Sequence, residues 1–187
     1  MKRMEKFPES CLVMAGGSGS RMANPQKFLL EIGNESILKR LIRILNSWGL
    51  KIYVAATHSN EHDIRSICEG CQILVTSGAG YAKDLHAALK KVKSFPVLVI
   101  GADTVVLDSM ALRSCIESAC DKDSDLVNII NTGTGFSASL FRRPPVYEEE
   151  VLVHTDFISS CEAALNINTP EDFRHASGLL EGCDHGE

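Results

Sequence analysis

The chain of 187 residues is 44% hydrophobic and 23% charged, and its formal net charge is -5. This size and composition predict a globular protein that buries its apolar surface without external staples, and we expect a single domain over residues 1–187. The negative charge argues against a protein that holds nucleic acid through a diffuse basic surface, so a phosphorylated ligand must meet a few local cations or a metal.

Short apolar runs alternate with helical patterns in the first half of the chain, which predicts buried parallel strands connected by helices. The predicted strands cover residues 11–15, 52–56, 73–76 and 97–100. Ser36 is the predicted N-cap of a helix that ends at Gly49, and a second helix follows Gly80. The residues expected on the inward face of this second helix are Tyr81, Ala82, Leu85, Ala88, Leu89 and Val92.

The second half continues the alternation. Its predicted elements are a helix over residues 109–120 and strands over residues 126–131 and 136–141, whereas residues 142–161 give no clear pattern. Thr169 is the predicted N-cap of a last helix, with Pro170 at its first position. The pattern implies a three-layer, Rossmann-like α/β fold with an open, mostly parallel sheet, whose ligand lies at the carboxyl ends of the strands.

Neither a membrane span nor a secretory signal is recognisable, because no run approaches about 20 apolar residues and the N-terminal segment lacks an apolar centre. We therefore expect a cytoplasmic protein without a membrane partner. The seven cysteines are an odd number in apolar surroundings, which favours reduced, buried thiols. A metal or redox site at Cys68 and Cys71, with His58 and His62 upstream, is an alternative that lacks the second cysteine pair of a typical zinc site.

A glycine-rich loop directly follows the first predicted strand, at the ligand edge of the sheet. Its residues are Gly16, Gly17, Ser18, Gly19 and Ser20. Glycines allow close approach of the backbone, and a row of N–H groups forms a concavity for phosphate, to which Arg21 and Lys27 add charge. The spacing matches neither the NTPase phosphate loop nor the dinucleotide fingerprint. A plain strand-to-helix turn is the alternative interpretation.

Two further strand ends carry residues suited to a nucleotide. The strand over residues 97–100 leads to Asp103, a carboxylate that can hold Mg²⁺ against phosphates. Another strand end turns through Gly78 and Ala79 toward Asp84, where the backbone can border a flat base and the carboxylate can accept hydrogen bonds from it. The structural alternatives are a turn or cap residue at Asp103 and an ordinary glycine turn at Gly78.

These motifs resemble a known family. The loop Met14-Ala-Gly-Gly-Ser-Gly-Ser-Arg-Met22, followed by Lys27, is similar to the signature of the nucleotidyltransferases that include molybdenum cofactor guanylyltransferase and the sugar-phosphate nucleotidyltransferases. The other matching segments are the metal-holding Gly101-Ala-Asp103, the base-pocket loop Gly78-Ala-Gly-Tyr81 and the closing motif Asn166-Ile-Asn-Thr-Pro-Glu-Asp172. The motifs follow in family order from about residue 11 to residue 180. The resemblance implies the nucleotide-diphospho-sugar transferase fold.

Within that superfamily, the chain is most similar to the archaeal-type adenosylcobinamide-phosphate guanylyltransferases of cobalamin synthesis. The resemblance lies in Thr76-Ser-Gly-Ala-Gly-Tyr-Ala-Lys-Asp-Leu85 and Leu165-Asn-Ile-Asn-Thr-Pro-Glu-Asp172. It implies that GMP passes from GTP to adenosylcobinamide phosphate, with adenosylcobinamide-GDP and pyrophosphate as products. A homodimer is a family expectation. Residues 142–161 match the family least, so the corrinoid side receives no residue assignment.

The resemblance and the chemistry together suggest roles. The acceptor phosphate is already an anion near neutral pH, so catalysis consists of positioning and electrostatic stabilisation and needs no histidine. Arg21 and the amides of residues 16–20 are expected to hold the β- and γ-phosphates of GTP, and Lys27 to reach the α-phosphate and the incoming oxygen.

Mg²⁺ is expected on Asp103, assisted by Asn168. Asn166 is the weaker candidate, on the expectation that only one of the two asparagines faces the metal. Guanine is expected to contact Asp84 and the main chain around Gly78 and Ala15.

Three alternatives remain at this stage. Molybdenum cofactor guanylyltransferase shares the loop, the metal and the fold, and differs in its acceptor. A sugar-phosphate nucleotidyltransferase is disfavoured by the short chain. A nucleotide-binding regulator that has lost turnover is the non-enzymatic alternative, because a fold alone does not fix a function.

Overall fold

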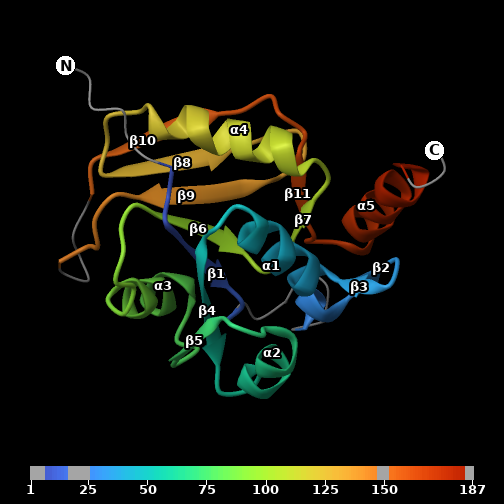
Figure 1. The fold of residues 1–187 in the computed structure, drawn as a ribbon, viewed down its shortest axis with the longest axis horizontal. Helices are drawn as coiled ribbons and strands as arrows, with labels where there is room; N and C mark the ends of the chain where they lie inside the picture. The colour runs from blue at the N-terminus through green and yellow to red at the C-terminus, as the bar shows by residue number, and fades with distance from the viewer. Residues whose placement is uncertain (1–6, 17–25, 147–151, 184–187) are drawn as a thin grey trace.

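The computed structural model describes residues 7–16, 26–146 and 152–183. Its centre is a sheet with strand order β10-β8-β9-β6-β1-β4-β5 (Figure 1). The strands are β1 (Ser10–Met14), β4 (Lys51–Thr57), β5 (Gln72–Thr76), β6 (Val97–Gly101), β8 (Leu126–Ile130), β9 (Ser137–Phe141) and β10 (His154–Ile158). Neighbouring strands are parallel except where β9 pairs with β6 and β8. The predicted mostly parallel α/β sheet is confirmed.

Helices cover both faces of this sheet. They are α1 (Ile37–Ser47), α2 (Glu61–Ile67), α3 (Tyr81–Leu89), α4 (Ser109–Cys120) and α5 (Pro170–Cys183). Buried residues of α1, α2 and α4, such as Leu41, Ile64 and Ile116, share one apolar cluster with one face of the sheet. Leu89 of α3 packs with Leu12 of β1 in a second cluster on the opposite face. The chain therefore has the expected three layers.

The predicted helix starts are confirmed at two caps. Ser36 Oγ accepts a hydrogen bond of 3.3 Å from the Lys39 amide at the start of α1. Thr169 Oγ1 accepts one of 3.1 Å from the Asp172 amide at the start of α5. Such caps satisfy backbone donors that a helix leaves unpaired at its first turn.

A third apolar cluster lies beside the main sheet and joins elements from distant parts of the chain. It connects the hairpin of β2 (Glu31–Ile32) and β3 (Glu35–Ser36) with α5 and with the antiparallel pair of β7 (Thr104–Val106) and β11 (Ala164–Asn166). Ile167 at its centre is fully buried. The cluster fixes the segment that follows β11 against the turn between β6 and β7.

The structure corrects one expectation about local environment and assigns one segment that the sequence left open. Tyr81 and Ala82 are exposed and do not face the core, because the first turn of α3 extends past the edge of the sheet. Within residues 142–161, which gave no pattern, the described part contains β10. In the described ranges, no helix has the length and hydrophobicity that crossing a membrane requires.

The cysteine alternative also finds no support. The described cysteines are free, and in residues 7–16, 26–146 and 152–183 no group of three or more His, Cys, Asp or Glu side chains is arranged to hold a metal ion. Cys68 and Cys71 follow α2, where a hydrogen bond between their side chains raises the pKa of the Cys68 thiol and lowers that of Cys71. They remain a reduced pair beside the core.

Candidate active site

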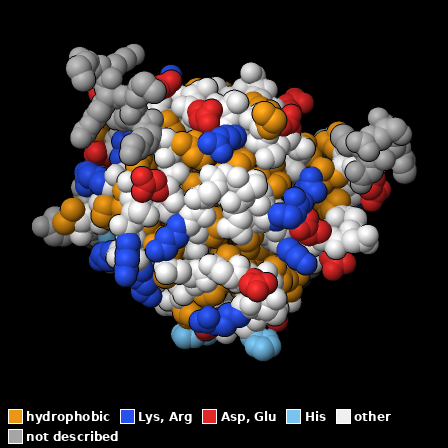
Figure 2. Space-filling model, viewed as in Figure 1, with side chains coloured by type: hydrophobic (Ala, Val, Ile, Leu, Met, Phe, Trp, Pro, Cys, Tyr) orange, Lys and Arg blue, Asp and Glu red, His pale blue; other side chains and the backbone are white. Residues whose placement is uncertain are grey.

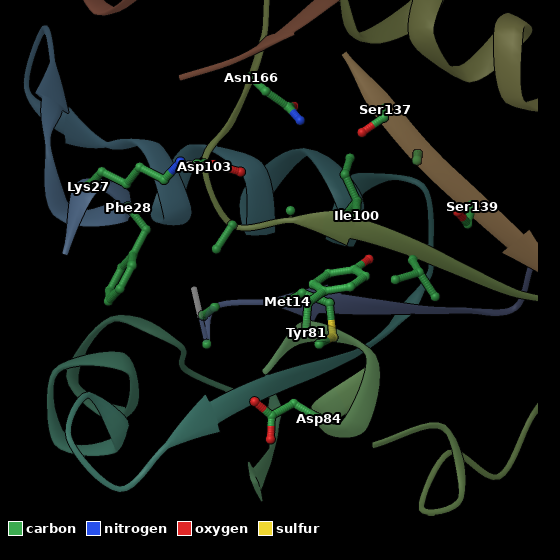
Figure 3. Close-up of a pocket in the computed structure, with 16 residues that line it drawn as sticks. Met14, Lys27, Phe28, Tyr81, Asp84, Ile100, Asp103, Ser137, Ser139 and Asn166 are labelled. Atoms are coloured by element: carbon green, nitrogen blue, oxygen red, sulfur yellow. Dashed lines mark ion pairs between the residues drawn. The ribbon is translucent and has the colours of Figure 1, made fainter. Parts of the chain in front are cut away.

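A cavity of about 360 Å³ opens at the carboxyl ends of β1 and β6, and β9 and the start of α3 form its other walls (Figure 3). This is the edge at which an open α/β sheet binds its ligand. The cavity brings together five of the residues that the sequence assigned to the site, namely Ala15, Gly16, Lys27, Asp84 and Asp103. They come from four separate stretches of the chain.

The end of β1 is held rigidly where it meets the cavity. The Ala15 amide donates to Ala55 O at 2.9 Å, and the buried Asn60 side chain donates to Ala15 O at 2.7 Å. A Cβ on Gly16 would lie 3.4 Å from Thr57 Cγ2 and 3.8 Å from Asp84 Oδ2, so the glycine brings its backbone close to the carboxylate. The remaining predicted loop residues, Gly17, Ser18, Gly19, Ser20 and Arg21, lie outside the described residues.

Lys27 and Asp103 form an ion pair on the cavity wall. Their side chains are 18% and 19% exposed, so the pair is largely shielded from water. Lys27 lies in a short 3-10 helix, η1 (Lys27–Leu29), which the buried Phe28 anchors in the core. Burial of a phenylalanine side chain contributes about 1.5–3 kcal/mol, which makes this a firm anchor for the neighbouring lysine.

Asp84 is a buried carboxylate that is only half satisfied. One oxygen, Oδ1, accepts hydrogen bonds from the Gly78 amide at 3.0 Å and from Ser77 Oγ at 3.4 Å. The other oxygen, Oδ2, is buried and has no hydrogen-bond partner among the residues that the structure describes. Because an unpaired buried acceptor costs free energy, a ligand that donates to this oxygen gains affinity.

The base-pocket loop differs in detail from expectation. Gly78 and Ala79 do not line the cavity, and the Gly78 amide already serves Asp84. The family resemblance had placed Tyr81 in this loop, whereas the helical pattern had turned it toward the core; it lines the cavity although it is 62% exposed. In Figure 3 its ring lies between Asp84 and Asn166. Partial removal from water, together with the nearby negative charge of Asp103, raises the pKa of Tyr81, so its hydroxyl is a neutral donor at neutral pH.

The two asparagines of the closing motif occupy different environments. Asn166, at the end of β11, lines the cavity, and its Oδ1 accepts a hydrogen bond of 2.9 Å from Thr104 Oγ1. Asn168 does not line the cavity, and its backbone N–H donates to Asp172 Oδ2 at 2.8 Å. Only one of the two faces the site, and it is the one that we considered weaker. Strand alternation would put residues two apart on the same side, but β11 ends at Asn166 and Asn168 belongs to the cap of α5.

The side chains of Asp103 and Asn166 fit a divalent cation that is shared with a nucleotide. Both are oxygen donors, and they approach the same cavity from two elements. Mg²⁺ is usually bound through one or two carboxylates together with substrate phosphates and water. A site with one carboxylate and one amide therefore suits a metal that arrives with phosphates better than a metal caged by protein alone.

Ser137 and Ser139 line the cavity on β9, and the sequence reasoning had assigned them only to a strand. Successive side chains of β9 point to opposite faces of the sheet, so Ala138 between them is buried and both serine hydroxyls point to the opposite face. A Ser-x-Ser pattern beside a sheet-edge turn was the available signal, but it is too common to identify a site.

The comparisons with known proteins agree with this geometry. The sequence matches the MobA-like NTP transferase domain family over residues 11–175. The adenosylcobinamide-phosphate guanylyltransferase of Methanocaldococcus jannaschii is 26% identical over 195 aligned positions, which cover 91% of this chain and 96% of that protein. NTP transferases of this kind commonly use a divalent metal with their nucleotide substrate.

Two solved structures show the same fold at low sequence identity. HddC from Yersinia pseudotuberculosis has a TM-score of 0.68 at 17% identity, covering 91% of this chain and 98% of its own. The inositol-1-phosphate CTP transferase from T. maritima has a TM-score of 0.67 at 11% identity. The match covers 97% of this chain and 98% of that protein. The expected nucleotide-diphospho-sugar transferase fold is thereby confirmed. With its family match over residues 11–175 and the cavity at the carboxyl ends of β1 and β6, the chain belongs to the MobA-like NTP transferase domain family and is a nucleotidyltransferase.

Proposed function

We propose that this nucleotidyltransferase transfers GMP from GTP to adenosylcobinamide phosphate, giving adenosylcobinamide-GDP and pyrophosphate. The observation that carries the proposal is the match to the guanylyltransferase of Methanocaldococcus jannaschii, which extends over 91% of this chain and 96% of that protein. The closing motif and the Gly80-to-Leu85 run of the chain lie inside the family match over residues 11–175 and border the cavity at Asn166 and Asp84.

Asp84 supports guanine as the base. Guanine presents the N1–H and the 2-amino group as adjacent donors, whereas adenine offers no donor at N1. The unpartnered Asp84 Oδ2 is a buried acceptor at the cavity. A hydrogen bond to a charged group contributes about 1.5–3 kcal/mol, enough to prefer GTP by one to two orders of magnitude.

The transfer itself requires charge stabilisation. An oxygen of the acceptor phosphate attacks the α-phosphorus of GTP, a new P–O bond forms, and the bond to the β-phosphate oxygen breaks to release pyrophosphate. Lys27 supplies a positive charge for the α-phosphate from the cavity wall. Asp103 and Asn166 would hold Mg²⁺, which neutralises the nucleotide phosphates when bound. No group on the acceptor must lose a proton, so no general base is needed.

The surroundings of the cavity suit a large acceptor. Beyond Ser139, a line of hydrogen bonds crosses the sheet from Ser139 Oγ to Asn128 Oδ1 at 3.2 Å and from Asn128 Nδ2 to Asp156 Oδ1 at 2.8 Å. Ile158 beside it is 63% exposed. A corrinoid carries amide side chains around an apolar ring, and this mixture of polar and apolar groups matches it.

The test has two stages. Isothermal calorimetry with Mg²⁺ and each of GTP, ATP, CTP and UTP should give selective binding of GTP. Pyrophosphate release should then follow with adenosylcobinamide phosphate and not with molybdopterin. Turnover with molybdopterin alone would assign the protein to molybdenum cofactor synthesis, and equal binding of the four nucleotides would refute the guanylyltransferase proposal. Lys91→Ala, a change in the exposed turn after α3, is the control variant that should leave both stages unchanged.

A further inference from the structure

The ammonium of Lys27 is held by two oxygens in a closed set of contacts. Lys27 Nζ pairs with Asp103 Oδ2 and donates to the carbonyl oxygen of Ile167 at 2.8 Å. The Ile167 amide in turn donates to the carbonyl oxygen of Asp103 at 2.9 Å. Three segments that are far apart in the sequence, η1, the turn between β6 and β7, and the residue after β11, are thus joined at one point.

The position of this ammonium is defined by buried structure on each side. Phe28 anchors η1, and Ile167 is fully buried in the cluster that includes Ala176 of α5. The Lys27 and Asp103 side chains are less than one fifth exposed. The contact therefore differs from an exposed surface ion pair, whose long side chains sample many geometries.

We propose that Lys27 occupies the cation position at Asp103 in the nucleotide-free protein, so that a divalent metal binds Asp103 only together with a nucleoside triphosphate. The proposal rests on the proposed use of the cavity for a metal-bound nucleotide, but it requires neither guanine nor a corrinoid. It gives Lys27 a second role, which is to keep the metal site closed until phosphates arrive.

Electrostatics supports this exchange of cations. A metal that enters alone must displace the ammonium from Asp103 or bind beside it, and either arrangement leaves two cations around a single carboxylate. When a triphosphate is present, the ammonium would move to a phosphate oxygen, and Asp103 would be free to hold the metal. Every cation then keeps an anionic partner. Metal and nucleotide should consequently raise each other's affinity, and such couplings typically amount to about 5- to 150-fold.

The experiment measures metal binding without nucleotide. Mn²⁺ is titrated into the 187-residue protein, and electron paramagnetic resonance reports the free Mn²⁺ concentration. The variants are Lys27→Met, which removes the ammonium, Lys27→Arg, which keeps a positive charge, and Lys91→Met as a control. We expect Lys27→Met to bind one Mn²⁺ at least about 10-fold more tightly than the other three proteins, within the range of such couplings. Adding Asp103→Asn to Lys27→Met should abolish this binding.

Two results would overturn the proposal: wild-type protein that binds Mn²⁺ as tightly as Lys27→Met, and tight Mn²⁺ binding by Lys27→Met that survives the added Asp103→Asn change. If Lys27→Met does not fold by circular dichroism, Lys27→Gln replaces it under the same criteria. A wrong base or acceptor in the proposed function would leave these titrations unaltered, so the two proposals fail independently.

Discussion

Gly101 shows how one missing side chain protects the site. A Cβ at this position would lie 2.5 Å from Asp103 Oδ1, closer than such atoms approach in real proteins, so Gly101→Ala must push the carboxylate aside. The clash is with the end of a flexible side chain, and we expect the free energy of unfolding to change by less than about 1 kcal/mol. Turnover should fall by at least about 10-fold, since misplacement of a catalytic group by an ångström is costly.

The measurement for Gly101→Ala is kcat/KM as a function of Mg²⁺, with urea unfolding as the stability control. Gly133→Ala, at a turn outside the cavity, is the matched substitution, and its new Cβ would meet Asn131 Oδ1 at 3.3 Å. A Gly101→Ala enzyme with unchanged kcat/KM would show that Asp103 does not need its present position.

Asp84 determines the base preference in our proposal. Asp84→Asn keeps the shape and can still accept from the Gly78 amide, but it turns the unpartnered Oδ2 into a donor. GTP affinity should fall by about 10-fold or more, because a charged hydrogen bond is lost, while ATP affinity should change little. Calorimetry with both nucleotides measures the ratio. An unchanged ratio would remove Asp84 from base recognition.

At the residue scale, the sequence predicted the positions that follow strand ends and failed where orientation depends on packing. Ala15, Gly16 and Asp103 could be located because strand ends of an open sheet meet at one edge. The choice of Asn168 over Asn166 as a metal ligand failed, because the sequence does not show that β11 ends at Asn166 and that Asn168 enters the cap of α5. Tyr81 has a core-like pattern, yet the first turn of α3 lies beyond the sheet.

At the element scale, a helix or strand could be predicted where its apolar residues follow a clear pattern. β1 and β6 are buried along nearly their whole length, and their runs of apolar residues were recognised. α2 buries only Ile64, so its sequence shows no helical spacing of apolar residues. β10 is an edge strand whose residues are exposed or half-buried, which hides it among loop residues.

The cap of α5 connects an element to the site. Asp172 Oδ2 accepts from the amides of Asn168 and Thr169 at 2.8 Å, directly after the Ile167 carbonyl that holds Lys27. Asp172→Ala should lower the free energy of unfolding by about 1 kcal/mol, a typical cost for a lost cap. It should also weaken binding of Mg²⁺ and GTP by several-fold, because the closing segment loses its anchor.

Asp108→Ala is the matched control for this cap. Asp108 Oδ1 accepts from the amides of Met110 and Ala111 at 2.9 Å at the start of α4, and it does not line the cavity. Urea unfolding should give a similar loss of stability for both variants, and calorimetry should give weaker nucleotide binding only for Asp172→Ala. Equal binding by the two variants would separate the α5 cap from the site.

At the scale of the whole molecule, the site is assembled from the length of the chain. Cavity residues run from Met14 to Asn166 in the sequence, and the ion pair of Lys27 and Asp103 closes the arrangement. On the face in Figure 2, acidic and basic side chains are interspersed. This agrees with the net charge of -5, from which we expect an anionic ligand to contact a few local cations or a metal instead of a broad basic surface. A ligand that bridges these segments should therefore stabilise the entire fold.

Thermal unfolding measures this coupling directly. A ligand at 100 times its Kd stabilises the native state by about 2.7 kcal/mol, and each kcal/mol raises Tm by about 2–4 °C in a chain of this size. GTP with Mg²⁺ should thus raise Tm by about 5–11 °C, as scanning calorimetry can measure. Mg²⁺ alone should shift it by less than about 1 °C, because Lys27 already neutralises Asp103. GTP in excess EDTA should give a smaller shift than GTP with Mg²⁺. Equal shifts in those two conditions would mean that the nucleotide binds without recruiting a metal to Asp103, and the site would then work through Lys27 and the backbone alone.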